Sequence, residues 1–297
     1  MIDDMRVVFE SRNRRACSDR ALVLTSVQIP HQLVDDIAGC ALVVPAEYSA
    51  RAVDELRLYD EENPPRRPAR KVEPFAHQNA VPGVVAYVLV IVGVAWLAGA
   101  SFFGQDWIAA GRVDGALIRA GEWWRTVTAL TLHAGLRHLL GNIVFGAFFG
   151  LFAGRLLGPG VAWLAIVLMG ASGNALNTLL LESTHKSIGA STAVFAALGL
   201  LAGFVWRAKL MSQERWPYRI GPIIGGFALL MFTGTGDAGP DSRTDVGAHL
   251  MGFLCGLTGG MLLALVRNEL TERRWQVIAA VLTVLLLGVA WITAFLA

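Results

Sequence analysis

The chain has 297 residues, of which 55% are hydrophobic and 16% are charged, and its mean hydropathy is +0.53. Soluble domains carry about 25% charged residues, so this composition excludes an ordinary water-soluble protein. The net charge of +2 is too small to indicate nucleic-acid binding, and the chain has no basic stripe interleaved with aromatic residues.

Charge is concentrated in residues 1–75, which we predict to form a small soluble α+β domain with a linker at its end. Two short runs rich in β-branched residues, Ala21–Val27 and Cys40–Pro45, are typical of strands. Apolar residues at helical spacing predict a helix over Ala46–Asn63. The segment Pro64–Lys71 is basic and proline-rich, which indicates a stiff linker. No catalytic arrangement is evident in this domain, and the sequence does not indicate its role.

Three cysteines are present, Cys17, Cys40 and Cys255, and none has C-x-x-C spacing. Neither a zinc site nor a disulfide framework is therefore expected. Cys255 lies in an apolar run, which is typical of a packed core residue. The N-terminal segment lacks the apolar core of a signal peptide, so no cleaved leader is expected.

Apolar segments of membrane-spanning length follow the linker and predict seven transmembrane helices. We place them at about 80–103, 136–157, 159–182, 191–206, 220–234, 246–266 and 275–296. Residues 76–270 contain six of these spans, and residues 271–297 contain the seventh, a C-terminal transmembrane helix. Basic residues cluster in alternate gaps between the helices, so the positive-inside rule predicts a cytoplasmic N-terminus and a C-terminus outside.

Polar side chains at the outer ends of three predicted helices are the main functional candidates, because polar groups inside spans are costly. His138 and Asn142 lie four residues apart, on one face of the second helix. Ser191 begins the fourth helix, and His249 lies just inside the sixth. These helices all run inward, which predicts a depth of roughly 6 Å below the outer surface for Ser191 and His249. A serine and a histidine at matched depth are a candidate nucleophile and general base.

Two serines follow a Gly-Ala pair, Ser172 in "GASG" and Ser191 in "GAST". Ser172 matches the G-x-S-G pattern more closely, but it lies in the middle of a predicted helix, where its N–H is already bonded. With Gly170, Ala171 and Gly173 it is interpreted as part of a packing surface. Ser191 lies at a helix N-terminus, where its N–H has no helical partner and can donate elsewhere. We therefore favour Ser191 as the nucleophile.

Four motifs follow one another along the chain: "WWR" before the second predicted helix, "HAGLRHLLGN" at its start, "GAST" at the start of the fourth and "AHLMGFLCG" on the sixth. In this order they resemble the motifs of the rhomboid family of intramembrane serine proteases. The resemblance covers about residues 76–270 and implies an all-α polytopic membrane protein with a six-helix rhomboid core. It also implies a serine endopeptidase, without cofactor or metal, that cleaves transmembrane or juxtamembrane segments of other membrane proteins near the outer face.

The resemblance further implies roles for individual residues. Ser191 is the expected nucleophile and His249 the expected general base, while His138 and Asn142 are expected to stabilise the oxyanion. The residues expected to be structural near the site are Gly189, His133, Phe195, Gly252, Trp124 and Arg125. The expected partners are the lipid bilayer and single-span or polytopic membrane-protein substrates, with no nucleic acid. The expected location is the bacterial inner (plasma) membrane.

Two residues depart from the family pattern: Thr192 replaces the Gly usual after the serine, and Phe195 stands where the family often has Tyr. Neither change removes a catalytic group, so an active protease is favoured over an inactive relative that binds membrane helices without cutting them. A transporter is a further alternative, but it would place polar groups near the midplane rather than at one face. His185 and Lys186, in the loop before Ser191, are expected to be solvated.

Overall fold

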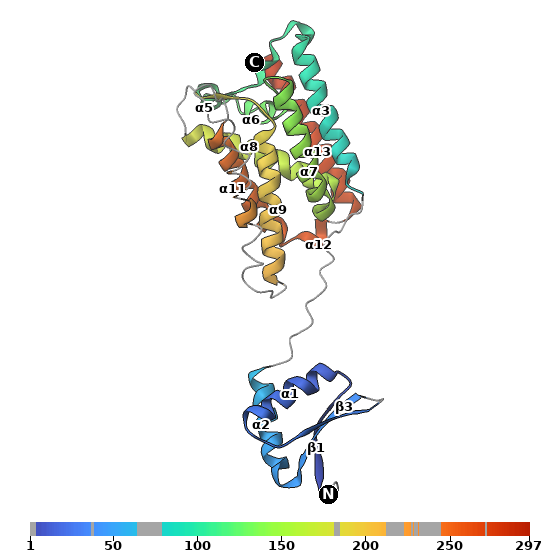
Figure 1. Cartoon of the computed structure of the whole chain (residues 1–297). Coiled ribbons are helices and arrows are strands. Elements are labelled where there is room, and N and C mark those ends of the chain that lie inside the picture. The colour runs from blue at the N-terminus through green and yellow to red at the C-terminus, as the bar shows by residue number, and fades with distance from the viewer. Residues whose placement is uncertain are drawn as a thin grey trace. The chain divides into compact units, whose positions relative to one another are not determined.

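The computed structural model describes residues 4–36, 39–63, 79–180, 185–211, 223–226, 228, 231, 245–270 and 272–297. They fall into two compact units, Met1–Ala69 and Arg70–Ala297, whose elements are labelled in Figure 1. The first unit is a small α+β fold, and the second is a bundle of long helices.

The N-terminal unit is a three-stranded antiparallel sheet packed against two helices. The strands β1 (Met5–Ser11), β2 (Gln32–Asp36) and β3 (Gly39–Pro45) are arranged in the order β1-β3-β2. The helices are α1 (Arg14–Ser26) and α2 (Ser49–Glu62), the latter preceded by a short 3₁₀ turn. Six apolar side chains form the buried core: Leu24, Ile29, Leu42, Val44, Ala52 and Leu56.

Two of the three elements predicted for this unit are present. The strand over Cys40–Pro45 corresponds to β3, and the helix over Ala46–Asn63 corresponds to α2. The strand predicted over Ala21–Val27 is wrong, because that run belongs to α1. Helix α1 is capped by the Asn13 side chain and buries one face, so β-branched composition alone misassigned the segment.

The expectation of no disulfide is also wrong. Cys17 on α1 and Cys40 on β3 are paired, with Cα atoms 6.4 Å apart. Both side chains are buried, where they join the helix to the central strand. Sequence spacing could not indicate this pair, because the two cysteines meet only after the helix packs on the sheet.

The second unit contains six helices, within the described residues, that are long and apolar enough to cross a membrane. They are α3 (Val81–Gly99), α7 (Leu136–Leu157), α8 (Pro159–Leu180), α9 (Ser191–Met211), α11 (Val246–Leu263) and α13 (Arg273–Leu296). They correspond to six of the seven predicted spans, and the chain is an integral membrane protein. The remaining predicted span, at about 220–234, falls largely outside the described residues.

Short elements fill the segment between α3 and α7. In chain order they are η2 (Phe102–Gly104), α4 (Trp107–Gly111), β4 (Val113–Asp114), α5 (Gly115–Arg119), α6 (Arg125–Thr128) and η3 (Ala129–Thr131). Strand β4 pairs antiparallel with β5 (Lys186–Ser187), in the segment leading to α9. A further short helix, α12 (Arg267–Leu270), precedes α13.

Helix α9 is the most buried of the six. In its membrane-spanning stretch 67% of the residues are buried, compared with 11% in that of α3. Figure 1 shows α9 within the bundle, where it contacts α7, α8 and α11. Glycines on α9 and α11 each face the backbone of the other helix: a Cβ at Gly256 would overlap the carbonyl oxygen of Ala196, and one at Gly199 would overlap that of Phe253. The absence of side chains there lets the two backbones approach closely.

The C-terminal helix α13 is bound to the bundle near both of its ends. Near its start, Gln276 Oε1 accepts hydrogen bonds from the N–H groups of Gly160 and Val161 at 3.0 and 3.2 Å. These two N–H groups lie in the first turn of α8, where they have no partner within the helix. Near its end, Trp291 Nε1 donates to Thr131 Oγ1 at 3.2 Å, and its ring lies 4.7 Å from that of Trp107. The helix beyond the predicted six-helix core is therefore packed against that core.

Candidate active site

Ser191 and His249 are brought together at the starts of their helices. Ser191 is the first residue of α9, and His249 lies in the first turn of α11. Ser191 Oγ lies 2.8 Å from His249 Nε2, a hydrogen-bonding distance. His249 is only 6% exposed. Because the glycines hold α9 and α11 in close contact, side chains in their first turns can meet although they are far apart in sequence.

Three buried residues support this pair. The Phe195 ring packs on the imidazole of His249, with ring centroids 4.5 Å apart. A Cβ at Gly252 would overlap the carbonyl oxygen of Thr192, so this glycine permits the helix contact directly beside the pair. The Thr192 methyl group fits between Gly173 and Gly252, where the absence of side chains leaves room for it. The two departures noted in the sequence are thus accommodated by packing.

The loop before α9 places the His138 imidazole beside Ser191. Gly189 has a φ of +142°, which favours glycine, and a Cβ there would lie 2.7 Å from the His138 ring and 3.4 Å from Ser191 Oγ. Gly189 N–H donates to the carbonyl of Ala129 at 3.0 Å, which fixes the loop against η3. A glycine at this position therefore leaves space for the imidazole next to the serine hydroxyl.

Asn142 and His133 flank His138. Asn142 is buried, and its side-chain amide donates to the carbonyl of His138 at 3.0 Å. The amide carries a second N–H that can serve another acceptor. The His133 ring packs edge-on against that of His138, with centroids 5.2 Å apart. Burial, together with nearby His138, lowers the pKa of His133 to about 4, so His133 is neutral at physiological pH.

Comparison with known proteins identifies the family. The family model described as "Rhomboid domain" matches residues 120–267, a range that contains Ser191 and His249. The chain belongs to the rhomboid family.

Three relatives show the extent of this rhomboid similarity. The chain is 29% identical over 198 residues to "Putative rhomboid protease YdcA" of Bacillus subtilis (strain 168), covering 65% of this chain and 92% of YdcA. It is 27% identical over 200 residues to "Rhomboid protease GluP" of the same organism, covering 66% of this chain and 38% of GluP. It is 31% identical over 144 residues to "Rhomboid-like protease 2" of Toxoplasma gondii, covering 48% of this chain and 49% of that protein. The chain thus matches less than half the length of the last two relatives.

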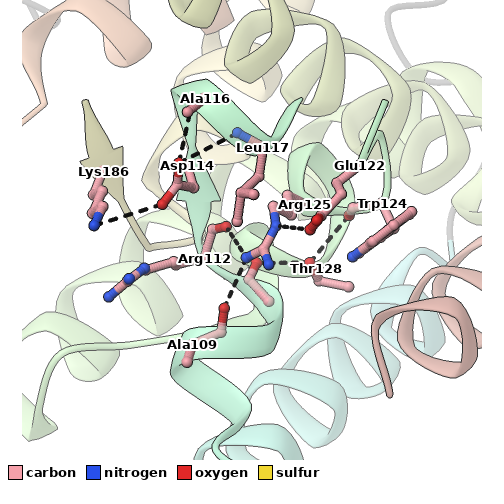
Figure 2. Close-up of polar contacts among 11 residues, drawn as sticks. Ala109, Arg112, Asp114, Ala116, Leu117, Glu122, Trp124, Arg125, Thr128 and Lys186 are labelled. Atoms are coloured by element: carbon pink, nitrogen blue, oxygen red, sulfur yellow. Dashed lines mark hydrogen bonds and ion pairs between the residues drawn. The ribbon is translucent and has the colours of Figure 1, made fainter. Parts of the chain in front are cut away.

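Trp124 and Arg125 of this rhomboid lie in the segment between α3 and α7, and both are buried. Figure 2 shows the Arg125 guanidinium among several acceptors. Its Nε donates to Glu122 at 2.5 Å, and its Nη1 donates to the carbonyls of Ala109 and Arg112 at 2.8 and 3.2 Å. These carbonyls lie at the end of α4, where a cation is favourable. These hydrogen bonds join α6 to α4 within the segment between α3 and α7.

Ser172, the alternative serine, is exposed midway along α8 of the rhomboid fold, while Gly170, Ala171 and Gly173 beside it are buried. The interpretation of these three neighbours as a packing surface agrees with their burial. For Ser172 itself that interpretation is wrong, because its position on the helix turns it outward.

The structure also brings together three polar residues that were not predicted as site residues. His185 was expected to be solvated, but its side chain is 21% exposed and its Nε2 lies 2.7 Å from Asp245 Oδ2. Asn177 Nδ2 lies 3.1 Å from each carboxylate oxygen of Asp245. The sequence contained one indication of the position of Asp245, since an Asp directly before an apolar helix is a typical N-cap.

The ionisation of Asp245 follows from its contacts. Burial raises the pKa of Asp245, but the N–H of Ala248 and neighbouring His185 outweigh burial and lower the pKa below its ordinary value. The carboxylate is therefore ionised at neutral pH. Its contribution to stability is present above the ordinary pKa of an Asp and is lost as the pH falls through the lowered value.

Proposed function

We propose that this rhomboid protein is an intramembrane serine endopeptidase in which Ser191 and His249 form a catalytic dyad. The observation that carries the proposal is the distance of 2.8 Å between Ser191 Oγ and His249 Nε2. A hydroxyl bonded to an imidazole nitrogen is the arrangement that activates a serine nucleophile. The protease names of the relatives YdcA and GluP support the same reaction class.

In the proposed reaction, Ser191 Oγ attacks the carbonyl carbon of the scissile peptide bond while His249 Nε2 accepts the hydroxyl proton. The tetrahedral intermediate then expels the amine, which receives that proton from His249, and the acyl group stays on Ser191. A water molecule next attacks the acyl carbon with His249 again as the base. This step releases the carboxylic acid and restores the Ser191 hydroxyl.

The negative oxygen of the tetrahedral intermediate requires hydrogen-bond donors. We assign this role to the N–H of Ser191, which lies in the first turn of α9, and to the side chains of His138 and Asn142. The placement of His138 next to Gly189 and Ser191 supports this assignment. The Phe195 ring, packed on His249, limits the rotation of the imidazole.

The substrates we propose are single-span or polytopic membrane proteins, cut within or beside a transmembrane segment near the outer face. The location we propose is a bacterial inner membrane, with the N-terminus in the cytoplasm and the C-terminus outside. The alternating basic loops support this orientation. The Cys17–Cys40 pairing weighs against it, because disulfides are rare in the cytoplasm. We give the basic loops more weight, since they act directly on membrane insertion.

A cleavage assay in liposomes tests the proposed function. Purified protein is reconstituted with a single-span substrate that carries a different label at each end. We expect the wild type to release two fragments cut in or beside the transmembrane segment, and Ser191→Ala to release none. If the wild type binds the substrate and leaves it intact, the protein is instead an inactive rhomboid-like protein that binds membrane helices.

A further inference from the structure

Asn177, His185 and Asp245, here called the outer clamp, join three parts of the membrane unit. Asp245 is the N-cap of α11, His185 directly precedes β5, and Asn177 lies on α8. The Asp245 carboxylate is the common acceptor, at 2.7 Å from His185 Nε2 and 3.1 Å from Asn177 Nδ2. Its side chain is only 12% exposed, so these hydrogen bonds are largely shielded from water.

The outer clamp is connected directly to His249. The side chain of Asp245 accepts the N–H of Ala248 at 2.9 Å, and its carbonyl accepts the N–H of His249 at 3.1 Å. Both bonds belong to the first turn of α11. A shift of Asp245 therefore moves the backbone that carries the His249 imidazole.

The outer clamp is connected to Ser191 through the loop of His185. The carbonyl of His185 accepts the N–H of Gly115 at 3.0 Å, and the next two residues form β5, paired with β4. The loop continues through Gly189 to Ser191 at the start of α9. Ser191 and Asp245 also line one small cavity of about 10 Å³. A displaced His185 therefore changes the position of the loop that leads to the serine.

We propose that His185 and Asp245 are positioning residues that hold Ser191 and His249 at reacting distance by joining the starts of their two helices. This inference rests on the proposed function, because it concerns the rate of the reaction assigned to that dyad. Neither residue is proposed to touch the substrate. Their contribution is to the geometry of the dyad, and a displacement of about 1 Å can lower a rate roughly 100-fold.

The central variant is His185→Ala, which removes the bond to Asp245 and leaves the N-cap of α11 in place. We expect kcat for the liposome substrate to fall about 10- to 100-fold, with KM unchanged. His185→Gln is expected to recover most of the loss, because the amide of Gln can donate to Asp245 in the same way. Thermal denaturation in detergent measures folding separately, so a lower kcat in a variant that denatures at the wild-type temperature is not caused by unfolding.

Lys186→Ala is the matched control on the same short strand. Lys186 is half-exposed and lies 3.7 Å from Asp114, outside the outer clamp. Asp114 is buried, but its carboxylate also accepts the N–H of Ala116 at 3.2 Å and so keeps a hydrogen bond without Lys186. We therefore expect kcat within about twofold of the wild type. Asp245→Asn keeps an N-cap but removes the carboxylate, and is also expected to lower kcat. The double variant of His185→Ala with Asp245→Asn is expected to be no slower than the slower single variant, because both remove one shared interaction.

The outcomes separate this inference from the proposed function. If the wild type and Ser191→Ala are equally inactive, the proposed function is overturned and the inference with it. If the wild type is active and His185→Ala matches Lys186→Ala in kcat, only the inference is overturned. Losses that multiply in the double variant would also contradict it, because independent contributions would then be indicated.

Discussion

Replacing His249 with alanine is expected to lower the cleavage rate by roughly 10³-fold or more, to the level of Ser191→Ala. Without the imidazole 2.8 Å from its oxygen, the Ser191 hydroxyl keeps its proton and is a poor nucleophile. Because the two residues act as one unit, the double variant is expected to be no slower than either single variant. The measurement is the initial rate of substrate cleavage in liposomes at equal protein concentration.

Ser172→Ala is the matched control for this prediction. Ser172 follows a Gly-Ala pair, as Ser191 does, but its side chain is exposed midway along α8. We expect this variant to cleave at the wild-type rate. A His249→Ala variant that cleaves as fast as the wild type would exclude the dyad, and a large loss in Ser172→Ala would point to the other serine.

Replacing Gly256 with valine is expected to separate α9 from α11 and to abolish activity. A Cβ at this position would overlap the carbonyl oxygen of Ala196, and a backbone atom cannot rotate away as a side chain can. Overpacking typically costs about 1–3 kcal/mol, and a collision with backbone lies at or above the upper end of that range. Thermal denaturation in detergent measures the loss of stability, and the liposome assay measures the loss of cleavage.

Gly288→Val provides the control for helix–helix packing. Gly288 also lies within an apolar helix, α13, but a Cβ there has no neighbour within 4 Å. We expect its stability to change by no more than about 0.5 kcal/mol. Equal denaturation temperatures for the two valine variants would show that α9 and α11 are not in backbone contact at Gly256.

The positions of Ser191 and His249 could be predicted because each depends on a helix boundary. Both residues follow short polar segments and precede long apolar runs, so the sequence indicates that they lie at the starts of inward-running helices. The position where a helix begins does not determine which of its faces points into the bundle. Ser172 is flanked by the small residues Gly170, Ala171 and Gly173, so residue size did not indicate that Ser172 points outward while its neighbours are buried.

The features that were missed depend on contacts between distant segments. His185 and Asp245 are 60 residues apart and meet only when the loop before α9 folds over the start of α11. Cys17 and Cys40 likewise meet only when α1 packs on β3. The misassigned strand over Ala21–Val27 has a local cause, since β-branched residues fit a helix when one face of that helix is buried.

The central claim is that Ser191 is the nucleophile, and a covalent probe tests it most directly. A fluorophosphonate reacts with an activated serine hydroxyl, whose oxygen bonds to phosphorus and displaces fluoride. After reaction of the full-length protein in detergent, peptide mass spectrometry locates the added mass. We expect the adduct on Ser191 in the wild type and no adduct in His249→Ala. An adduct on Ser172 or on another serine of an actively cleaving protein would contradict the account.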